Sequence, residues 1–192
     1  MSEDVGAAKD ELRRQVTASR AARSVEDLDV AGHGLAAVLL ASPLLGSART
    51  VAAYVSFGTE PPTGPLLDGL RDAGVRVLLP LVRPAGVLDW ALDDGALSPG
   101  GLGIPEPAGE PLGPSALATA DVVLVPALAA DAAGHRLGRG AGYYDRALAS
   151  LPPGVPVVVV VFDADVVAHV PTEPHDVPAT HLATPTSLTP TP

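Results

Sequence analysis

The sequence predicts an α/β fold of three layers, in which helices cover both faces of a mainly parallel central sheet. Residues 50–56 and 75–82 are apolar stretches typical of strands, and a short helix is predicted between them at 66–73. This strand, helix, strand order favours a parallel crossover. Residues 155–162 are mostly valine, which is typical of a strand covered on both faces and placed at the sheet centre. Together these features indicate a Rossmann-like architecture.

The first predicted element is a helix at residues 7–23, where strong helix formers follow one another without Gly or Pro. On such a helix Lys9, Arg13 and Arg20 are expected to share one side, with Val16 roughly opposite. The helix therefore has a basic side.

Turn signals divide the rest of the chain into further elements. We expect a helix at 26–41 weakened by Gly32 and Gly34, a turn at 57–65 and a helix terminator at Gly74. An edge strand at 87–92 and an irregular Gly/Pro-rich excursion at 93–119 are expected next. They are followed by a strand at 121–126, a Gly-rich loop at 131–142 and a helix at 143–151. A loop as long as this excursion is usually functional or disordered. Residues 1–184 are expected to form a single catalytic α/β domain, and the Thr/Pro-rich tail at 185–192 is expected to be disordered.

The charge and composition exclude several classes of partner. The formal net charge is −10 and no long basic run is present, which argues against binding to nucleic acid or to an acidic membrane. The chain has no cysteine, so disulfides, thiolate nucleophiles and cysteine zinc sites are excluded. The first residues lack the basic start of a signal peptide, and the longest apolar run, at 155–162, is too short to span a bilayer. We therefore expect a cytoplasmic monomer that acts on a small molecule.

Three polar segments follow predicted strands, at the edge where ligands bind in open α/β sheets. Glu60 follows the strand at 50–56, and the Gly-rich loop follows the strand at 121–126. His175 and Asp176 follow the valine strand. Because the fold would bring these distant segments to one edge of the sheet, we expect the functional site there.

The Gly-rich loop has the sequence Gly-His-Arg-Leu-Gly-Arg-Gly-Ala-Gly-Tyr-Tyr-Asp-Arg at residues 134–146 and gives the strongest functional signal. Its four glycines permit backbone conformations that other residues resist, so successive N–H groups can form an anion-binding nest. The helix predicted to start after Gly142 would add free N–H groups and a positive dipole end. Arg136 and Arg139 add charge and forked hydrogen bonds, and Asp145 offers a hard oxygen ligand for Mg²⁺.

The spacing of these glycines matches neither a Walker loop nor the Gly-x-Gly-x-x-Gly dinucleotide fingerprint. On spacing alone the segment is a phosphate-binding loop, and the alternative is a flexible Gly-rich surface turn. The chain offers no obvious protein nucleophile.

The same loop is similar to a known family signature. The segment Arg-Leu-Gly-Arg-Gly-Ala-Gly-Tyr-Tyr-Asp at 136–145 resembles the signature of the 5-formyltetrahydrofolate cyclo-ligases, also called methenyltetrahydrofolate synthetases. Further matches, in family order, are Lys-Asp-Glu-Leu-Arg at 9–13, the segment 54–63 with Glu60, Gly-Ile-Pro-Glu-Pro at 103–107 and the pair His175-Asp176. The resemblance runs from residue 9 to about 184, which is nearly the whole chain.

The resemblance implies a role for each matched residue. ATP would be bound by Lys9, Asp10, Glu11, Leu12, Arg13, Arg136, Leu137, Gly138, Arg139, Gly140, Ala141, Gly142, Tyr143 and Tyr144. The folate substrate would contact Val55, Glu60, Gly140 and Tyr143. Mg²⁺ would be held by Asp145, with Asp176 as a second candidate, and the catalytic residues would be Arg139, Tyr144 and Asp145.

The activity implied by the resemblance is the ATP- and Mg²⁺-dependent conversion of 5-formyltetrahydrofolate to 5,10-methenyltetrahydrofolate. ADP and phosphate are released, and the reaction passes through a phosphorylated formyl group. Such a transfer needs positioning and charge neutralisation rather than a protein nucleophile.

Two alternative functions stay open at this point. One is a nucleotide-binding sensor or partner of the same fold without turnover, and the other is a sugar-phosphate isomerase or acyl-transfer enzyme of similar architecture. Two departures from the family pattern are relevant. Ala130 stands where an aromatic is usual, so the pocket is expected to be looser there, and Thr180 stands where Asp is common, which makes Asp176 the weaker metal candidate.

Overall fold

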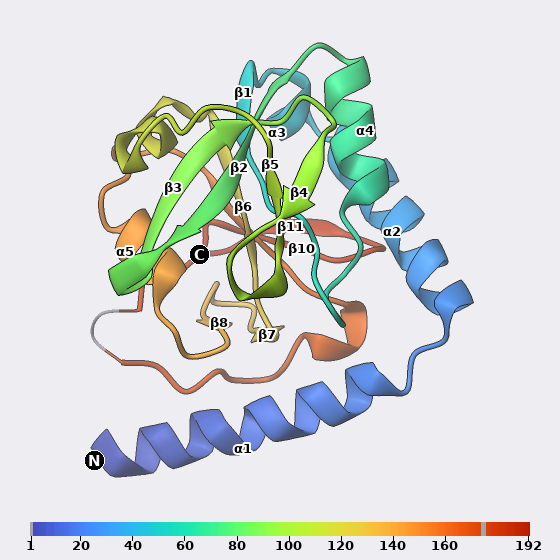
Figure 1. Cartoon of the computed structure of the whole chain (residues 1–192). Coiled ribbons are helices and arrows are strands. Elements are labelled where there is room, and N and C mark those ends of the chain that lie inside the picture. Colours follow the sequence, from blue (N-terminus) through green and yellow to red (C-terminus); the bar gives the residue numbers. More distant parts are fainter. Residues whose placement is uncertain (1, 174–175) are drawn as a thin grey trace.

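A seven-stranded sheet forms the middle layer of the protein in the computed structural model, which describes residues 2–173 and 176–192 (Figure 1). The order of its strands is β11-β10-β9-β6-β1-β2-β3. Their bounds are β1 Thr50–Ala52, β2 Arg76–Arg83, β3 Val87–Leu92, β6 Val122–Pro126, β9 Val157–Val160, β10 His181–Ala183 and β11 Leu188–Pro190.

The five inner strands of this sheet run parallel, and both edge strands are antiparallel to their neighbours. The parallel crossover between β1 and β2 and the edge position of β3 confirm two expectations from the sequence. Taken along the chain, the parallel strands have the order 2-1-3-4-5, a doubly wound arrangement whose switch point lies between β1 and β6.

The valine strand β9 is fully buried, but it is not the central strand. The expectation failed because the sequence analysis did not predict β10 and β11, which extend the sheet beyond β9 and leave β6 in the middle.

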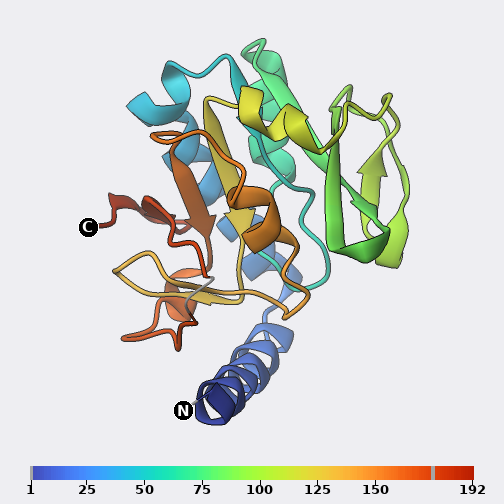
Figure 2. The ribbon, with the colours of Figure 1, turned by 90° about the vertical axis from the view of Figure 1, so that its left-hand side faces the viewer.

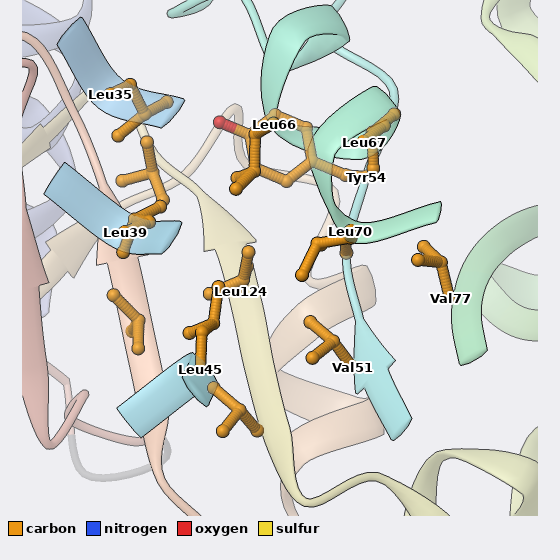
Figure 3. Close-up of a cluster of buried hydrophobic side chains, with 14 of the residues drawn as sticks. Leu35, Leu39, Leu45, Val51, Tyr54, Leu66, Leu67, Leu70, Val77 and Leu124 are labelled. Atoms are coloured by element: carbon orange, nitrogen blue, oxygen red, sulfur yellow. The ribbon is translucent and has the colours of Figure 1, made fainter. Parts of the chain in front are cut away.

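Helices cover the two faces of the sheet unequally (Figure 2). The helices α2 Val25–Leu40, α3 Pro43–Gly46 and α4 Gly64–Asp72 pack on one face, and α5 Tyr143–Leu148 with the 3₁₀ segment η3 Pro114–Thr119 covers the other. Figure 3 shows the larger cluster, in which leucines of α2 and α4 meet the strand residues Val51 and Leu124. The three-layer α/β fold class is confirmed.

Helix α2 is defined by local signals at its start and by close contacts with other segments at its glycines. The Ser24 hydroxyl accepts the Asp27 N–H while the Asp27 carboxylate accepts the Ser24 N–H, which is a capping box. A Cβ at Gly34 would lie 2.6 Å from the carbonyl oxygen of Pro185. The glycines that weaken this helix therefore allow other segments of the chain to pack against it.

The Thr/Pro-rich tail differs from its expectation of disorder, because residues 188–190 form the edge strand β11, antiparallel to β10. The tail is further held by Thr184, whose hydroxyl donates to the Asp163 carboxylate at 2.6 Å. Pro190 lacks a backbone N–H, and an edge strand tolerates this because one of its sides needs no partner. A composition typical of disorder is thus compatible with an edge strand.

The excursion at 93–119 is more regular than expected. It contains a hairpin of β4 Leu97–Pro99 and β5 Pro105–Pro107, with η2 Gly101–Gly103 between them. The buried carboxylate of Glu106 accepts the N–H groups of Val82 at 2.9 Å and Gly101 at 3.1 Å. Glu106 therefore fastens this hairpin to β2.

Helix α1 Ser2–Ala21 lies outside the three layers, beneath the rest of the molecule in both views (Figures 1 and 2). Its buried Val16 packs against a small cluster that includes Leu137 of the short hairpin β7 Ala129–Ala130 and β8 Arg136–Leu137. Val16 therefore lies on the same side as Lys9, not opposite it, because seven residues are close to two full turns of a helix. No helix within the described residues is long and apolar enough to cross a membrane.

The C-terminal end of α1 is anchored by a buried ion pair. Arg20 Nε lies 2.8 Å from Asp165 Oδ2, and Arg20 Nη2 donates to the carbonyl oxygens of Ala127 and Leu128, each at 2.9 Å. The side chains of Arg20 and Asp165 are 0% and 2% exposed. This contact fixes α1 to the segment that follows β6.

Candidate active site

A cleft of about 450 Å³ opens beyond the carboxyl ends of β1 and β6. Tyr54 and Val55, which follow β1, and Ala127 and Leu128, which follow β6, form its base. This is the switch point of the strand order, where open α/β sheets bind their ligands. The expected position of the functional site therefore coincides with a real cleft.

Lys9 of α1 reaches the cleft from the side opposite the sheet. Its Nζ lies 2.8 Å from Glu173 Oε2 and 2.8 Å from Asp176 Oδ2. Burial alone would lower the pKa of Lys9, but the hydrogen bonds to Asp176 and Glu173 raise it above its ordinary value. Lys9 is therefore a cation at neutral pH.

Arg136 of β8 is the second cation of the cleft, and its side chain is nearly buried. Its Nη2 donates to Asp145 Oδ1 and its Nη1 to the carbonyl oxygen of Val177. Burial lowers the pKa of Arg136, while Asp145 and Asp176 oppose that effect. A guanidinium stays protonated under such conditions, so the positive charge remains.

Arg139 and Glu60 meet across the mouth of the cleft. Arg139 Nη2 and Nε lie 3.2 and 3.3 Å from Glu60 Oε1, while Glu60 Oε2 accepts the N–H of Phe57 at 2.9 Å. The side chain of Glu60 is 11% exposed and that of Arg139 is 53% exposed. Two segments 79 residues apart in sequence are thus joined at the site.

The loop between Arg136 and Tyr143 lines the cleft with its backbone. Gly140 and Gly142 have φ angles of 97° and 67°, which other residues rarely adopt. Arg13 of α1 donates from Nε to the Gly138 carbonyl oxygen at 3.0 Å and so ties the loop to the helix. Because α5 has only six residues, ending earlier than the predicted 143–151, the loop amides are better donors for an anion than its terminus.

Tyr143 and Tyr144 begin α5 and line the cleft, with part of each side chain packed against the core. Burial raises the pKa of Tyr144 far above its ordinary value, and the nearby charge of Glu60 adds to the rise. Tyr144 is therefore a neutral hydroxyl that can donate or accept a hydrogen bond, not an anion.

One wall of the cleft is apolar, and sequence reasoning missed it. Pro80, Val82 and Leu88 of the β2–β3 hairpin line it, together with Ile104 of the β4–β5 hairpin. Ile104 belongs to the Gly-Ile-x-Glu-Pro match, so that motif is the sequence feature that could have indicated this wall. The anchor Glu106, two residues on, explains why Ile104 is held beside Val82.

The structure brings almost all the predicted site residues together. The cleft is lined by Lys9, Arg13, Val55, Glu60, Arg136, Leu137, Gly138, Arg139, Gly140, Ala141, Gly142, Tyr143, Tyr144, Asp145 and Asp176. Asp10, Glu11 and Leu12 do not line it, because they occupy other sides of α1. Their sequence neighbours Lys9 and Arg13 reach the cleft, and the roles of all these residues stay predictions.

The two departures from the family pattern lie away from the cleft lining. Ala130 is fully buried in the core, so the expected looseness of the pocket does not follow from it. Thr180 donates to the Val157 carbonyl oxygen and accepts its N–H, at the amino end of β9. Thr180 therefore gives no reason to doubt Asp176 as a candidate metal ligand. His175 lies outside the described residues.

The fold and the cleft define a class of protein: a doubly wound α/β protein with a switch-point site that combines four cations, a glycine loop and an apolar wall. The sequence profile of the 5-formyltetrahydrofolate cyclo-ligase family matches residues 5–185. This chain belongs to that family.

Individual relatives agree with this assignment. The chain is 43% identical over 183 residues to the 5-formyltetrahydrofolate cyclo-ligase of Mycolicibacterium smegmatis, covering 92% of this chain and 93% of that protein. It is 33% identical over 174 residues to the enzyme of the same name from Escherichia coli K12, covering 88% and 96%. An NMR structure of 5,10-methenyltetrahydrofolate synthetase from Aquifex aeolicus superposes with a TM-score of 0.81 and 28% identity, covering 95% of this chain and 92% of that one.

Proposed function

We propose that this protein converts 5-formyltetrahydrofolate to 5,10-methenyltetrahydrofolate with consumption of ATP. The observation that carries the proposal is the combination, in one cleft, of Lys9, Arg13, Arg136 and Arg139 with an apolar wall. Four cations suit a triphosphate, and an apolar wall suits the face of a pterin ring. Family membership supports this choice over a sugar-phosphate isomerase or an acyl transferase.

The phosphates of ATP would lie against the loop at 138–142, with the basic side chains around them. Each of these cations is paired with an oxygen of the protein, such as Asp145 for Arg136 and Asp176 for Lys9. Phosphate oxygens would replace those partners, because Arg and backbone N–H groups form short, charge-assisted hydrogen bonds with them.

The folate would contact Glu60, Val55, Gly140 and Tyr143. A carboxylate accepts two hydrogen bonds at once, so Glu60 suits the neighbouring N–H groups of a pterin. Val55 and the apolar wall at Val82 and Ile104 would pack against the ring.

Asp145 and Asp176 would hold Mg²⁺. Their carboxylates are hard oxygen donors, and both lie close enough to Arg136 to influence its pKa. The described residues contain no group of three or more His, Cys, Asp or Glu suited to a metal, which fits an ion that binds through one or two carboxylates together with substrate phosphates. When bound, Mg²⁺ supplies neutralisation of the phosphate charge.

In the proposed reaction the formyl oxygen attacks the γ-phosphorus of ATP and ADP leaves. Arg139 and the loop amides would stabilise the charge on the transferring phosphoryl group. The folate N10 then attacks the activated carbon and gives up its proton, the carbon–oxygen bond breaks, and phosphate departs with that proton to leave the methenyl bridge. Tyr144, which lines the cleft as a neutral hydroxyl, would orient the formyl group.

A direct assay tests the function. Purified protein is mixed with 5-formyltetrahydrofolate, ATP and Mg²⁺, and near-ultraviolet absorbance follows the methenyl product. Product formation that requires both ATP and Mg²⁺ supports the proposal. ATP binding without product would instead indicate a nucleotide-binding sensor, and a protein indifferent to ATP would contradict the nucleotide site.

The proposal includes a monomer that works in the cytoplasm. Light scattering coupled to size-exclusion chromatography checks the first point, and cell fractionation checks the second.

A further inference from the structure

We infer that Arg146 is a positioning residue that holds the glycine loop in the shape that binds ATP. Arg146 lies on α5 outside the cleft lining and carries no role in the proposed mechanism. Its side chain nevertheless contacts the loop and a second, distant segment. This inference rests on the proposed function, because the loop is taken as the ATP site.

The guanidinium of Arg146 bridges two backbone carbonyl groups. Its Nη2 donates to the Ala141 carbonyl oxygen at 2.7 Å, inside the loop, and its Nε donates to the Gly86 carbonyl oxygen at 2.9 Å, in the turn between β2 and β3. The guanidinium also lies 5.6 Å from the centroid of the Tyr143 ring. A planar fork of donors suits this bridging geometry, and a lysine would make only part of it.

Two glycines far apart in sequence leave space for this side chain. A Cβ at Gly86 would lie 2.0 Å from Arg146 Nη2, and a Cβ at Gly142 would lie 2.8 Å from Nη1. Both glycines have positive φ, as does the neighbouring Ala85 at 60°. A non-glycine residue in that region is strained, so the conformation of Ala85 lowers the stability of the turn. The same turn conformation brings the Gly86 carbonyl group to Arg146.

The loop needs such an anchor because its own sequence does not fix it. Three glycines lie between residues 138 and 142, and glycine keeps the most backbone freedom. Among the described residues, its backbone accepts side-chain hydrogen bonds from Arg13 at Gly138 and from Arg146 at Ala141, while the Arg139 side chain pairs with Glu60. Arg13 faces the cleft, where ATP would engage it, so Arg146 is the anchor that stays in place when ATP binds.

The sharpest test changes Gly86, which does not itself line the cleft. In Gly86→Ala the new methyl group would displace the Arg146 guanidinium, which can move because it ends a flexible side chain. The matched control is Gly74→Ala, since Gly74 has the same φ of 73° but nothing within 4 Å of its Cβ position. Both variants place an alanine at the same φ, and only Gly86→Ala brings a methyl group against Arg146.

Equilibrium binding of ATP alone is measured by calorimetry. Loss of the anchor is expected to raise the Kd of ATP about tenfold in Gly86→Ala and Arg146→Gln, equivalent to about 1.4 kcal/mol, with a smaller rise in Arg146→Lys. Gly74→Ala should stay within about twofold of the parent protein. If Gly86→Ala and Arg146→Gln bind ATP as the parent does, the inference is wrong.

A second measurement needs no ligand. Trypsin cleaves after Arg139, which is exposed within the loop, and mass spectrometry identifies the fragment 140–192. Faster cleavage in Gly86→Ala and Arg146→Lys than in Gly74→Ala supports the anchor, and equal rates contradict it. A parent protein that does not bind ATP would refute the proposed function, while this comparison would still decide the role of Arg146.

Discussion

Arg139 and Glu60 form an ion pair at the cleft, with Arg139 Nη2 3.2 Å from Glu60 Oε1. In the proposed function these residues serve different substrates, since Arg139 binds phosphate and Glu60 binds the pterin. A phosphate that draws Arg139 away would leave Glu60 free to accept hydrogen bonds from the folate. The ion pair thus links the proposed phosphate site to the proposed pterin site.

The first prediction is that ATP strengthens folate binding through this pair. A non-hydrolysable ATP analogue should lower the Kd of 5-formyltetrahydrofolate by up to about fivefold, because an exposed ion pair contributes about 0.2–1 kcal/mol. Fluorescence titration measures the Kd with and without the analogue. Arg139→Gln should abolish the difference, whereas Arg14→Gln, a variant of an exposed arginine outside the cleft, should keep it. An undiminished effect in Arg139→Gln would rule out the pair as the link.

The second prediction concerns turnover. Arg139→Ala should lower kcat at least about a hundredfold, because arginines that act on a transferring phosphoryl group are worth about 10³–10⁵ in rate. The melting temperature should change little, since the side chain is 53% exposed and its pairing contributes little to stability. The methenyl absorbance assay and thermal unfolding test the two parts separately. Turnover equal to that of the parent would remove Arg139 from the mechanism.

The third prediction concerns acid stability and Asp131. Its buried carboxylate accepts N–H groups of Ala133, His135 and Val170 and contacts the His135 ring. Burial alone would raise the pKa of Asp131, but the hydrogen bonds from Val170 and His135 lower it below 3.8 overall. Asp131→Asn should lower the free energy of unfolding by about 1–3 kcal/mol at neutral pH, because an amide oxygen cannot accept all these bonds.

The pH dependence of that difference has a definite sign. A lowered folded-state pKa gives stability that is present above the unfolded-state value, near 3.8, and is lost as the pH falls through the folded-state value. Urea unfolding of the parent and Asp131→Asn should therefore converge below pH 3.8. Asp72→Asn, at an exposed carboxylate, serves as the control, and a constant difference at all pH values would contradict the assignment.

The fourth prediction concerns the buried pair of Arg20 and Asp165. Asp165→Asn should lower the free energy of unfolding by about 3–5 kcal/mol, because it leaves the Arg20 charge buried without a counterion. The double variant Arg20→Met with Asp165→Leu should recover part of the loss, since it removes the unpaired charge. Glu11→Gln, at an exposed pair with Arg14, should leave the urea midpoint of unfolding unchanged. Urea unfolding of all three variants decides whether this pair contributes as expected.

Local signals were sufficient for most of the fold. The sheet strands β1, β2, β3, β6 and β9 follow from apolar stretches and turn residues, whereas the β4–β5 and β7–β8 hairpins were not predicted. Gly74 ends α4 with the left-handed φ that its position predicts. Local signals failed for β10 and β11, because His-Leu-Ala and Leu-Thr-Pro are too short to show an apolar pattern of their own. Their pairing depends on the edge offered by β9.

The candidate site could be predicted where backbone chemistry defines it, as in the glycine loop. It could not be predicted where tertiary contacts define it. Val16 was misplaced on α1, and the apolar wall at Val82 and Ile104 went unnoticed, because both depend on which distant segments meet. The burial of Arg20 likewise depends on Asp165, which lies 145 residues away in the sequence.

Lys9 is the only lysine of the chain, and it lies in the cleft. The one lysine ε-amine of this protein therefore lies at the proposed nucleotide site. An acylating reagent that modifies Lys9 would report, by peptide mapping, whether the site is occupied, and coupling to a solid support through lysine would block the site in every immobilised molecule.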